Sequence, residues 1–315
     1  MDVDAHVEAW ASLQLVPGLD ASGLFRLLKA LGSPVEVRGA SQASLSRYVS
    51  GELAAAIRRG PDPGQLDRTL AWLAAPGHSL VAWGDADYPA ALLASADPPP
   101  AFYHVGRLDL LNRPALAIVG SRNATAEGVG HAEAFAAALS AAGWTVVSGL
   151  GAGIDAAAHR GGLTAAGSSL AVVATGLDRV YPPANRALAK RLAAAGCLIS
   201  EFPLGTAPLP ANFLRRNGAI SGLCRGVLVV QATLTSGSLG LARLAAEQGR
   251  EVFAIPGSIH SPFSKGSHRL IKEGAKLVET ADDILEELKP GAPTSALARS
   301  DLSCAPGHRR KPRQP

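Results

Sequence analysis

Short apolar runs alternate with alanine-rich stretches through the middle of the chain, and this pattern predicts a parallel sheet. The runs are rich in β-branched residues and lack the polar alternation of a strand that faces water on one side, so we expect strands covered on both faces. Helices between such strands predict an α/β fold with a doubly wound, mostly parallel sheet. The expected strands are LAIVG (116–120), WTVVSG (144–149), SLAVVATG (169–176), CLISE (197–201), GVLVVQA (226–232) and EVFAIPG (251–257).

Helical spacing of apolar positions marks residues 1–75, which we predict to form a small all-helical domain of the helix-hairpin-helix or SAM-like type. The segment VPGLD (16–20) lies between two such stretches. This layout is typical of an ordinary helical hairpin, and also of modules that contact DNA phosphates through amides at a helix N-terminus. The sheet domain is expected over 76–289. The proline-flanked, low-complexity tail over 290–315 is expected to be disordered.

Composition favours a globular protein of 315 residues, 47% of them hydrophobic. No apolar run approaches the roughly 18 residues that a membrane helix needs, and the opening MDVDAHVEAW lacks the pattern of a signal peptide. We therefore expect a cytoplasmic protein with no membrane partner. The cysteines at 197, 224 and 304 lie far apart, which predicts neither a disulfide framework nor a zinc site.

The formal charge of +4 comes from the C-terminal tail. Residues 290–315 hold five of the 30 cationic residues and one of the 26 acidic ones, which leaves 25 of each in the rest of the chain. Any electrostatic site in the body must therefore arise from local clustering of charge.

Polar, glycine-rich loops follow the expected strands, at the sheet edge where ligands bind in doubly wound folds. The segment GLGAGIDA (149–156) contains the G-x-G-x-x-A of a dinucleotide site, but it belongs to the second βα unit, and the first unit reads G-S-R. We therefore expect no cofactor. Gly151 and Gly153 are interpreted as glycines that let the loop approach a ligand and expose amides at a helix N-terminus.

Cations near the same edge indicate an anionic ligand. Arg122 follows the first expected strand, and we expect it to converge with later cations on one rim, where they would bind a polyanion longer than a mononucleotide. Ser236, Gly237 and Ser238 open a helix; they could simply cap it, but their place at the carboxyl edge of the sheet favours contact with a phosphate. The later cations are Arg215, Arg216, Lys265, His268 and Arg269.

Asp155 and His159 stand four residues apart on an expected helix, so their side chains can meet. An acid beside a histidine could serve as a base and its orienting group, but no nucleophile is identifiable beside them. A capping aspartate with a paired histidine is the simpler interpretation. We assign no catalytic residue and no metal ligand.

An ordered series of motifs from about Leu80 to Leu288 resembles the DNA-processing protein A family, also called Smf, of bacterial natural transformation. The resemblance implies an extended Rossmann-like domain that binds single-stranded DNA, forms a homodimer and loads a RecA-type recombinase, with no bound nucleotide and no established reaction. The motifs are IVGSR, SGLGAGIDAAAH, GLDRVYPPAN, ISEFP, RRN, ISGL, VLVVQA, SGSL, AAEQGREVFAIPG and KGSHRLIKEGA.

The family's DNA pocket maps onto three segments of this chain. Arg122 stands where a pyrophosphate would lie in a dinucleotide site, and its planar fork suits a backbone phosphate. Phe213, Phe263 and Tyr181 could stack on bases. The mapped residues are Gly120, Ser121, Arg122, Arg216, Asn217, Lys265 and Gly266.

This chain departs from the family pattern. Gly218 replaces a usual arginine, Gln231 a frequent glutamate and Leu241 a threonine, and no winged helix is expected after Leu288. We expect weaker DNA binding, with the basic tail as a partial substitute. A glycine inside a helix costs about 1 kcal/mol relative to alanine, so local order near Gly218 is expected to suffer.

Two other functions stay open. One is a nucleotide-processing enzyme of the phosphoribohydrolase type, which would need a P-G-G-x-G-T loop followed closely by a glutamate. PGSIHSP and TSGSLGLARLAAE supply this incompletely, with Glu247 as a loose candidate. The other is a diverged family member that acts only through protein partners.

Overall fold

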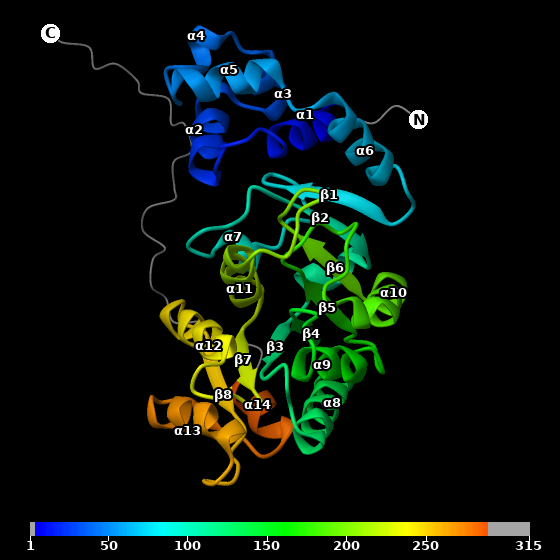
Figure 1. The fold of residues 1–315 in the computed structure, drawn as a ribbon, viewed down its shortest axis with the longest axis vertical. Coiled ribbons are helices and arrows are strands. Elements are labelled where there is room, and N and C mark those ends of the chain that lie inside the picture. The colour runs from blue at the N-terminus through cyan, green and yellow to red at the C-terminus, as the bar shows by residue number, and fades with distance from the viewer. Residues whose placement is uncertain (1–3, 289–315) are drawn as a thin grey trace, which may run out of the picture.

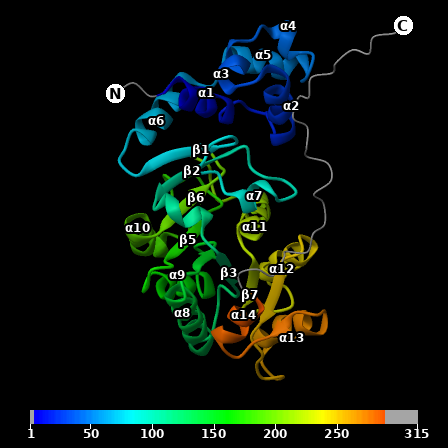
Figure 2. The same cartoon turned by 180° about the vertical axis from the view of Figure 1, so that it is seen from behind.

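A nine-stranded sheet runs through the larger part of the molecule in the computed structural model, which describes residues 4–288 (Figures 1 and 2). The strand order is β1-β2-β6-β5-β4-β3-β7-β8-β9. β1 and β2 pair in antiparallel fashion at one edge, and β2 pairs antiparallel with β6, whereas all other neighbours are parallel. The strands are β1 His78–Ala82, β2 Ala101–Gly106, β3 Ala115–Val119, β4 Thr145–Ser148, β5 Ser169–Val172, β6 Cys197–Ser200, β7 Gly226–Val229, β8 Glu251–Ala254 and β9 Lys276–Leu277.

The six strands expected from the apolar runs are confirmed as β3 to β8. Every residue of β3, β4, β5, β6 and β7 is buried, as expected for strands covered on both faces. The observed strands end before the glycine-rich loops begin, so they are shorter than the apolar runs. β9 was not expected, because two exposed residues carry no strand pattern.

Helices cover both faces of the sheet. One core joins α8, α9 and α14 to one face, with α10 packed on a smaller cluster beside it. The other face packs against α7, α11, α12 and α13. These helices are α7 Ala90–Leu93, α8 Ala126–Ala141, α9 Ile154–Gly162, α10 Arg186–Ala195, α11 Pro210–Leu223, α12 Gly237–Glu247, α13 Lys265–Lys272 and α14 Ala281–Glu287.

The winding direction reverses between β3 and β7. From β3 the chain adds β4, β5 and β6 in one direction, then returns through α11 to place β7 on the other side of β3 and β8 beyond it. Loops that leave adjacent strands on opposite faces diverge at such a point and leave a crevice at the carboxyl edge. The fold therefore predicts a ligand site between the loops after β3 and β7.

Six short helices form the N-terminal region above β1 and β2 (Figure 1). Trp10, Leu13 and Leu27 share one buried core with Leu80 and Tyr103 of these strands, so the helices pack directly on the sheet edge. A separate folding unit over 1–75 stays a prediction. The helices are α1 Ala5–Gln14, α2 Ala21–Leu31, α3 Pro34–Gly39, α4 Gln42–Leu45, α5 Gly51–Arg59 and α6 Pro63–Leu73.

The hairpin between α1 and α2 favours the ordinary interpretation of that turn. Gly18 has a φ of 81°, a left-handed conformation that suits glycine. The carboxylate of Asp20 caps α2 by accepting a hydrogen bond from the Gly23 amide (2.7 Å). A negative charge already occupies this helix N-terminus, which opposes the approach of a phosphate.

Gly218 does not disturb its surroundings, contrary to our expectation. α11 runs unbroken from Pro210 to Leu223, and Gly218 lies within it. Neighbouring turns supply enough hydrogen bonds and packing to offset the cost of a single glycine.

Four further expectations concern a membrane helix, a metal site, the cysteines and the C-terminal tail. Within residues 4–288, no helix is both long and apolar enough to cross a membrane, and no cluster of histidine, cysteine and acidic residues could hold a metal ion. Cys197 and Cys224 are buried and free. The tail over 290–315, with Cys304 and the expected absence of a winged helix, lies outside the described residues.

Candidate nucleic-acid interface

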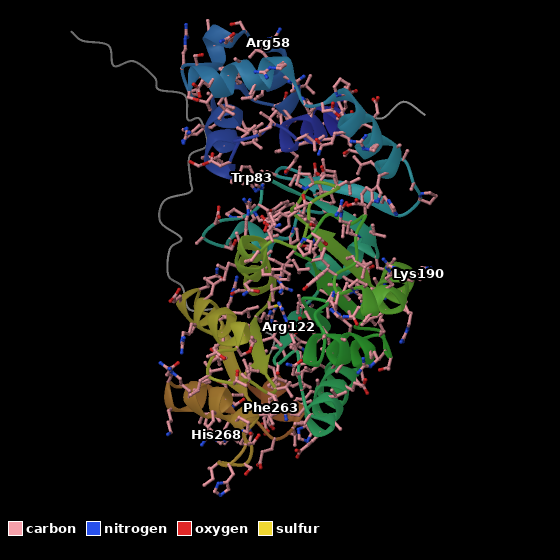
Figure 3. All side chains as sticks on the ribbon, in the orientation of Figure 1. Arg58, Trp83, Arg122, Lys190, Phe263 and His268 are labelled. Carbon is pink, nitrogen blue, oxygen red and sulfur yellow. The ribbon has the colours of Figure 1, made fainter. Side chains whose placement is uncertain are left out.

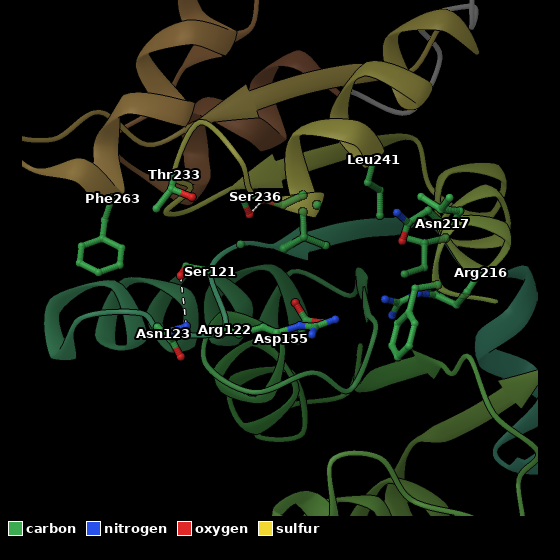
Figure 4. A pocket seen from close by; sticks show the side chains of 17 residues that line it. Ser121, Arg122, Asn123, Asp155, Arg216, Asn217, Thr233, Ser236, Leu241 and Phe263 are labelled. Atoms are coloured by element: carbon green, nitrogen blue, oxygen red, sulfur yellow. Dashed lines mark hydrogen bonds between the residues drawn. The ribbon is translucent and has the colours of Figure 1, made fainter. Parts of the chain in front are cut away.

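A pocket of about 490 Å³ opens at the point where the sheet reverses its winding (Figure 4). The loops after β3 and β7 form two of its walls. The first turns of α9 and α12 and one face of α11 complete it. Of the sequence-predicted site residues, it brings together Gly120, Ser121, Arg122, Arg216, Asn217, Ser236, Gly237 and Ser238.

The loop after β3 is held tightly against its neighbours. A Cβ on Gly120 would lie 2.7 Å from the Gln231 carbonyl oxygen and 2.7 Å from Cγ1 of Ile154, so only glycine allows this approach. The next amide, that of Ser121, donates to the same Gln231 carbonyl (2.7 Å). The chain therefore leaves β3 in a fixed direction and carries the Arg122 side chain into the pocket.

Arg216 enters the pocket from α11 and is buried, with 9% of its surface exposed. Its Nη1 atom donates to the Val172 carbonyl (3.3 Å), whereas its buried Nε atom has no hydrogen-bond partner among the described residues. A buried guanidinium with an unused donor is costly, because the charge has lost its water without full compensation. An anion in the pocket would balance the charge of this buried guanidinium.

Gly149 makes room for this guanidinium. A Cβ atom at position 149 would overlap Nη1 of Arg216, so any larger residue would push the arginine aside. The glycines of SGLGAGID are interpreted from the sequence as room for a ligand. That interpretation does not predict that Gly149 makes room for the side chain of Arg216. The closeness of a side chain from α11 could not be derived from the motif.

Asp155 also faces the pocket and counters the arginines. Burial raises the pKa of its carboxyl, and Arg216 is the strongest influence in the opposite direction. Burial likewise lowers the pKa of Arg216; Asp155 opposes that shift and Arg122 adds to it. The two arginines thus share a single half-buried carboxylate, which leaves an excess of positive charge in the pocket.

The expected pairing of Asp155 with His159 is wrong. Asp155 caps the preceding loop, where its Oδ2 atom accepts from the Gly151 amide (3.1 Å). The ring of His159 instead bonds to two other groups. Its Nε2 atom accepts from the Leu150 amide (3.3 Å), and its Nδ1 atom lies 2.7 Å from the Ser169 hydroxyl. Burial lowers the pKa of His159 to about 3, so it is a neutral core residue.

Both arginines of the pocket contact the ring of Phe213. The guanidinium carbon of Arg122 lies 5.4 Å from the centre of the Phe213 ring, and that of Arg216 lies 5.8 Å from it. Tyr181, 42% exposed, meets Phe213 edge to face with ring centres 5.9 Å apart. Cations and aromatic faces side by side can serve the phosphates and the bases of a strand.

The opposite wall carries hydroxyl groups at the start of α12. Ser236 precedes the helix without capping it through its side chain; its hydroxyl bonds to that of Ser238 (2.7 Å). Backbone amides of the first turn are therefore not taken up by a side-chain cap and can meet an anion. Leu241 lies on the same wall, where a threonine would have added a hydroxyl.

Gln231 supports the pocket from behind. Its Oε1 atom accepts from the Thr125 amide (3.1 Å) and its Nε2 atom donates to the Thr125 hydroxyl (2.8 Å). The side chain therefore links the end of β7 to the start of α8 and does not line the pocket. Glutamine in place of the family's frequent glutamate at position 231 therefore alters the contact with Thr125 and not the lining of the pocket.

Several predicted residues do not reach the pocket. Arg215 turns away because adjacent helical positions lie about 100° apart, and its Nε pairs with Glu201 Oε2 (2.5 Å). Lys265 donates to the Ile259 carbonyl. Arg269 pairs with Glu273 (2.8 Å). The expected convergence of all the cations on one rim is therefore wrong.

The remaining predicted glycines support the pocket from outside it. Gly151 donates its amide to Asp155. Gly153, with a φ of 68°, allows the start of α9 to meet the Ser121 carbonyl, which a Cβ would strike. Gly266 lies against the chain after β7, where a Cβ would come 2.6 Å from the Ala232 carbonyl oxygen. These glycines position the loops, and the pocket lining does not include them.

Fold and pocket together define a class, a doubly wound α/β protein with a cationic pocket where its sheet reverses direction. The chain belongs to the DNA recombination-mediator protein A family, which residues 79–289 match. This confirms the resemblance drawn from the motifs.

Relatives with known names agree. The chain is 45% identical to Protein Smf of Escherichia coli (strain K12) over 243 residues, which cover 75% of this chain and 65% of that protein, just under two thirds of its length. It is 44% identical to DNA processing protein DprA of Streptococcus pneumoniae (strain ATCC BAA-255 / R6) over 214 residues, 68% of this chain and 74% of that protein.

Solved structures are similar as well. The X-ray structure of DprA from Streptococcus pneumoniae matches with a TM-score of 0.78 and 33% identity, over 92% of this chain and 99% of that chain. A structure of DprA from Helicobacter pylori, described for its single-stranded DNA binding mode, matches with a TM-score of 0.61 and 29% identity, over 67% of this chain and 95% of that chain. The extended Rossmann-like fold is thereby confirmed.

Proposed function

We propose that this protein binds single-stranded DNA in the pocket between β3 and β7 and acts as a recombination mediator in natural transformation. The observation that carries the proposal is the buried guanidinium of Arg216, whose Nε atom lacks a partner within residues 4–288 and which lines the pocket with Arg122. A backbone phosphate supplies the anionic acceptor that these two forks need.

The aromatic pair argues for a strand with exposed bases. Phe213 lines the pocket beside the cations, and Tyr181 packs against it edge to face. Base stacking on such rings tolerates any sequence, because every base has a π-face. Paired DNA hides those faces, so we expect a strong preference for unpaired strands.

The names of the relatives support the same role. The Helicobacter pylori protein is described by its binding of single-stranded DNA. We extend that activity to this chain, together with a homodimeric state, the loading of a RecA-type recombinase and the absence of a bound nucleotide cofactor. Arg122, Arg216, Asn217 and the hydroxyls of α12 are the proposed contacts.

The enzyme alternative has less support. A phosphoribohydrolase would need a carboxylate near the glycine-rich helix start, and the loose candidate was Glu247. Glu247 is the last residue of α12, whereas the pocket lies at the first turn of that helix. Ten residues of helix separate the two by about 15 Å. We therefore propose a binding protein without catalytic residues.

Binding and base release should be measured on the same sample. A labelled oligothymidine of about twenty nucleotides and a duplex of equal length are titrated by fluorescence anisotropy. We expect the single strand to bind far more tightly than the duplex, and no free base to form from nucleoside monophosphates. Equal affinity for both, or base release that Glu247→Gln abolishes, would reject the proposal.

Recombinase loading needs its own assay. RecA filament growth is followed on single-stranded DNA that is already coated with a single-strand-binding protein. The protein should shorten the lag before growth, and Arg122→Ala should restore the lag. A lag that the wild-type protein leaves unchanged would remove loading from the proposal while leaving DNA binding in place.

A further inference from the structure

A second cavity lies next to the pocket between β3 and β7, which we call the switch-point pocket. The Tyr181 ring lines the second cavity. This cavity has a volume of about 610 Å³ and lies between α10, the segment after β5 and the end of α6. Tyr181 lines this cavity, whereas Phe213 lines the switch-point pocket. Because these two rings meet with centres 5.9 Å apart, one aromatic pair joins the two cavities.

Cations dominate the rim of the second cavity. Arg186 and Lys190 stand one turn apart on α10; both are exposed, and within residues 4–288 neither forms an ion pair. Arg179 lies 3.8 Å from Asp178, the one carboxylate among the described residues that line the cavity. The rim is therefore positive in a body that is otherwise close to neutral.

The inner wall is apolar. Leu150, Val173, Val180 and Leu198 line it, with Tyr181 at its entrance. Apolar walls accept the face of a base, and cations at the rim accept the phosphates that flank it. This combination suits a nucleic-acid strand better than an acidic peptide, which would have no use for the apolar floor.

The cavity continues toward the N-terminal helices. A third cavity of about 600 Å³ shares Trp72 and Arg179 with it and is lined by Gln65 and Arg68 of α6. Figures 1 and 2 show α6 and α10 on the same side of the molecule, next to the strand edge formed by β1 and β2. The second and third cavities thus form one groove that runs from Tyr181 to α6.

We infer that a single DNA strand held in the switch-point pocket crosses Tyr181 and continues along this groove, where Arg186 and Lys190 each bind a phosphate. This inference rests on the proposed function. It gives the N-terminal helices a role, because α6 forms the far wall of the path. It also makes affinity depend on strand length, since a short strand fills the first pocket alone.

A double variant tests the path. Arg186→Ala combined with Lys190→Ala is titrated with oligothymidines of about six and about twenty nucleotides. Loss of two phosphate contacts should reduce the slope of log affinity against log salt by about 1.4 for the long strand, and its affinity by about tenfold near 0.15 M salt. The affinity for the short strand should stay within about twofold of the wild-type value.

The matched control removes the same charge elsewhere. Lys29→Ala combined with Arg59→Ala takes two exposed cations from α2 and α5. Arg59 follows Arg58, which lies at the end of the molecule away from Arg122 and Lys190 (Figure 3). This control should bind both strands like the wild type. Circular dichroism melting of both double variants checks that they fold.

The possible results distinguish failure of the proposed DNA path from failure of DNA binding as such. An unchanged affinity of the Arg186/Lys190 variant for the long strand would overturn the groove, and so would an equal loss for both strands. Equal losses in the control and the variant would show a net-charge effect and would also overturn it. If the wild-type protein bound neither strand, the proposed function itself would fail.

Discussion

The side chain of Arg216 crosses the Cα atom of Gly149 so closely that a Cβ atom there would overlap its Nη1 atom. Gly149 follows the end of β4 and precedes the G-x-G-x-x-A pattern of Gly151–Ala156 by two residues. The bare backbone at Gly149 gives the guanidinium of Arg216 its place against the loop after β4.

Gly149→Ala should weaken both DNA binding and folding. The added methyl group must displace Arg216, which removes a charged hydrogen-bond donor worth about 1.5 to 3 kcal/mol to a phosphate. We expect the affinity for single-stranded DNA to fall by about tenfold or more, and stability by about 1 to 3 kcal/mol through overpacking. Anisotropy titrations and urea unfolding measure the two effects. An affinity within twofold of the wild type would show that Arg216 does not need its observed position.

Gly218→Ala is the control for Gly149→Ala and should raise the stability of the protein. Gly218 lies inside α11, and a Cβ there would meet no atom within 4 Å. Alanine lowers the conformational freedom of the unfolded chain, so the free energy of unfolding should rise by about 0.5 to 1 kcal/mol. DNA affinity should not change. A loss of stability would mean that α11 is strained at this position.

Phe213→Ala should weaken binding through the bases. The ring contacts Arg122, Arg216 and Tyr181, so its loss removes the stacking surface and frees both arginines from a common anchor. Stacking on one aromatic ring is worth about 1 to 3 kcal/mol, which predicts a loss of roughly fivefold to 150-fold. The affinity for an abasic strand of equal length should change far less. Equal losses for both strands would assign Phe213 to arginine positioning alone.

Asp155 should make DNA binding depend on pH. Burial raises the pKa of Asp155, so the folded protein keeps this proton to a higher pH than the unfolded chain does, and the stability gained from it is lost as the pH rises through the raised pKa. A neutral carboxyl does not repel a phosphate, and it leaves the charge of Arg216 free for DNA. Affinity should therefore increase as the pH falls through that pKa.

Asp155→Asn tests this origin of the pH dependence. The variant should bind more tightly than the wild type near neutral pH, and its affinity should vary less with pH. Anisotropy titrations from about pH 8 to about pH 5 supply both curves. Parallel curves for the two proteins would assign the pH dependence to another group.

Much of the fold was predictable because it depends on local pattern. The buried strands β3 to β7 come from continuous, mostly apolar runs, and a parallel sheet is the fold that covers such runs on both faces. β9 was beyond reach, since Lys276 and Leu277 are both exposed. The antiparallel attachment of β2 to β6 depends on packing between distant segments, which one sequence does not reveal.

The candidate site was predictable only in part, for a related reason. Arg122 follows directly from its position after β3. Arg215 and Arg216 are adjacent in sequence, and only the rotational phase of α11 decides that one faces the pocket and the other faces Glu201. Lys265 depends on a contact with the Ile259 carbonyl that no spacing rule contains.

The salt dependence of single-stranded DNA binding tests the central claim most directly. Affinity for an oligothymidine is measured over a range of salt concentrations for the wild type, Arg122→Ala and Arg216→Ala. If each arginine binds one phosphate, each substitution reduces the slope of log affinity against log salt by about 0.7. Slopes that remain equal to the wild-type value in both variants would contradict a DNA strand held between β3 and β7.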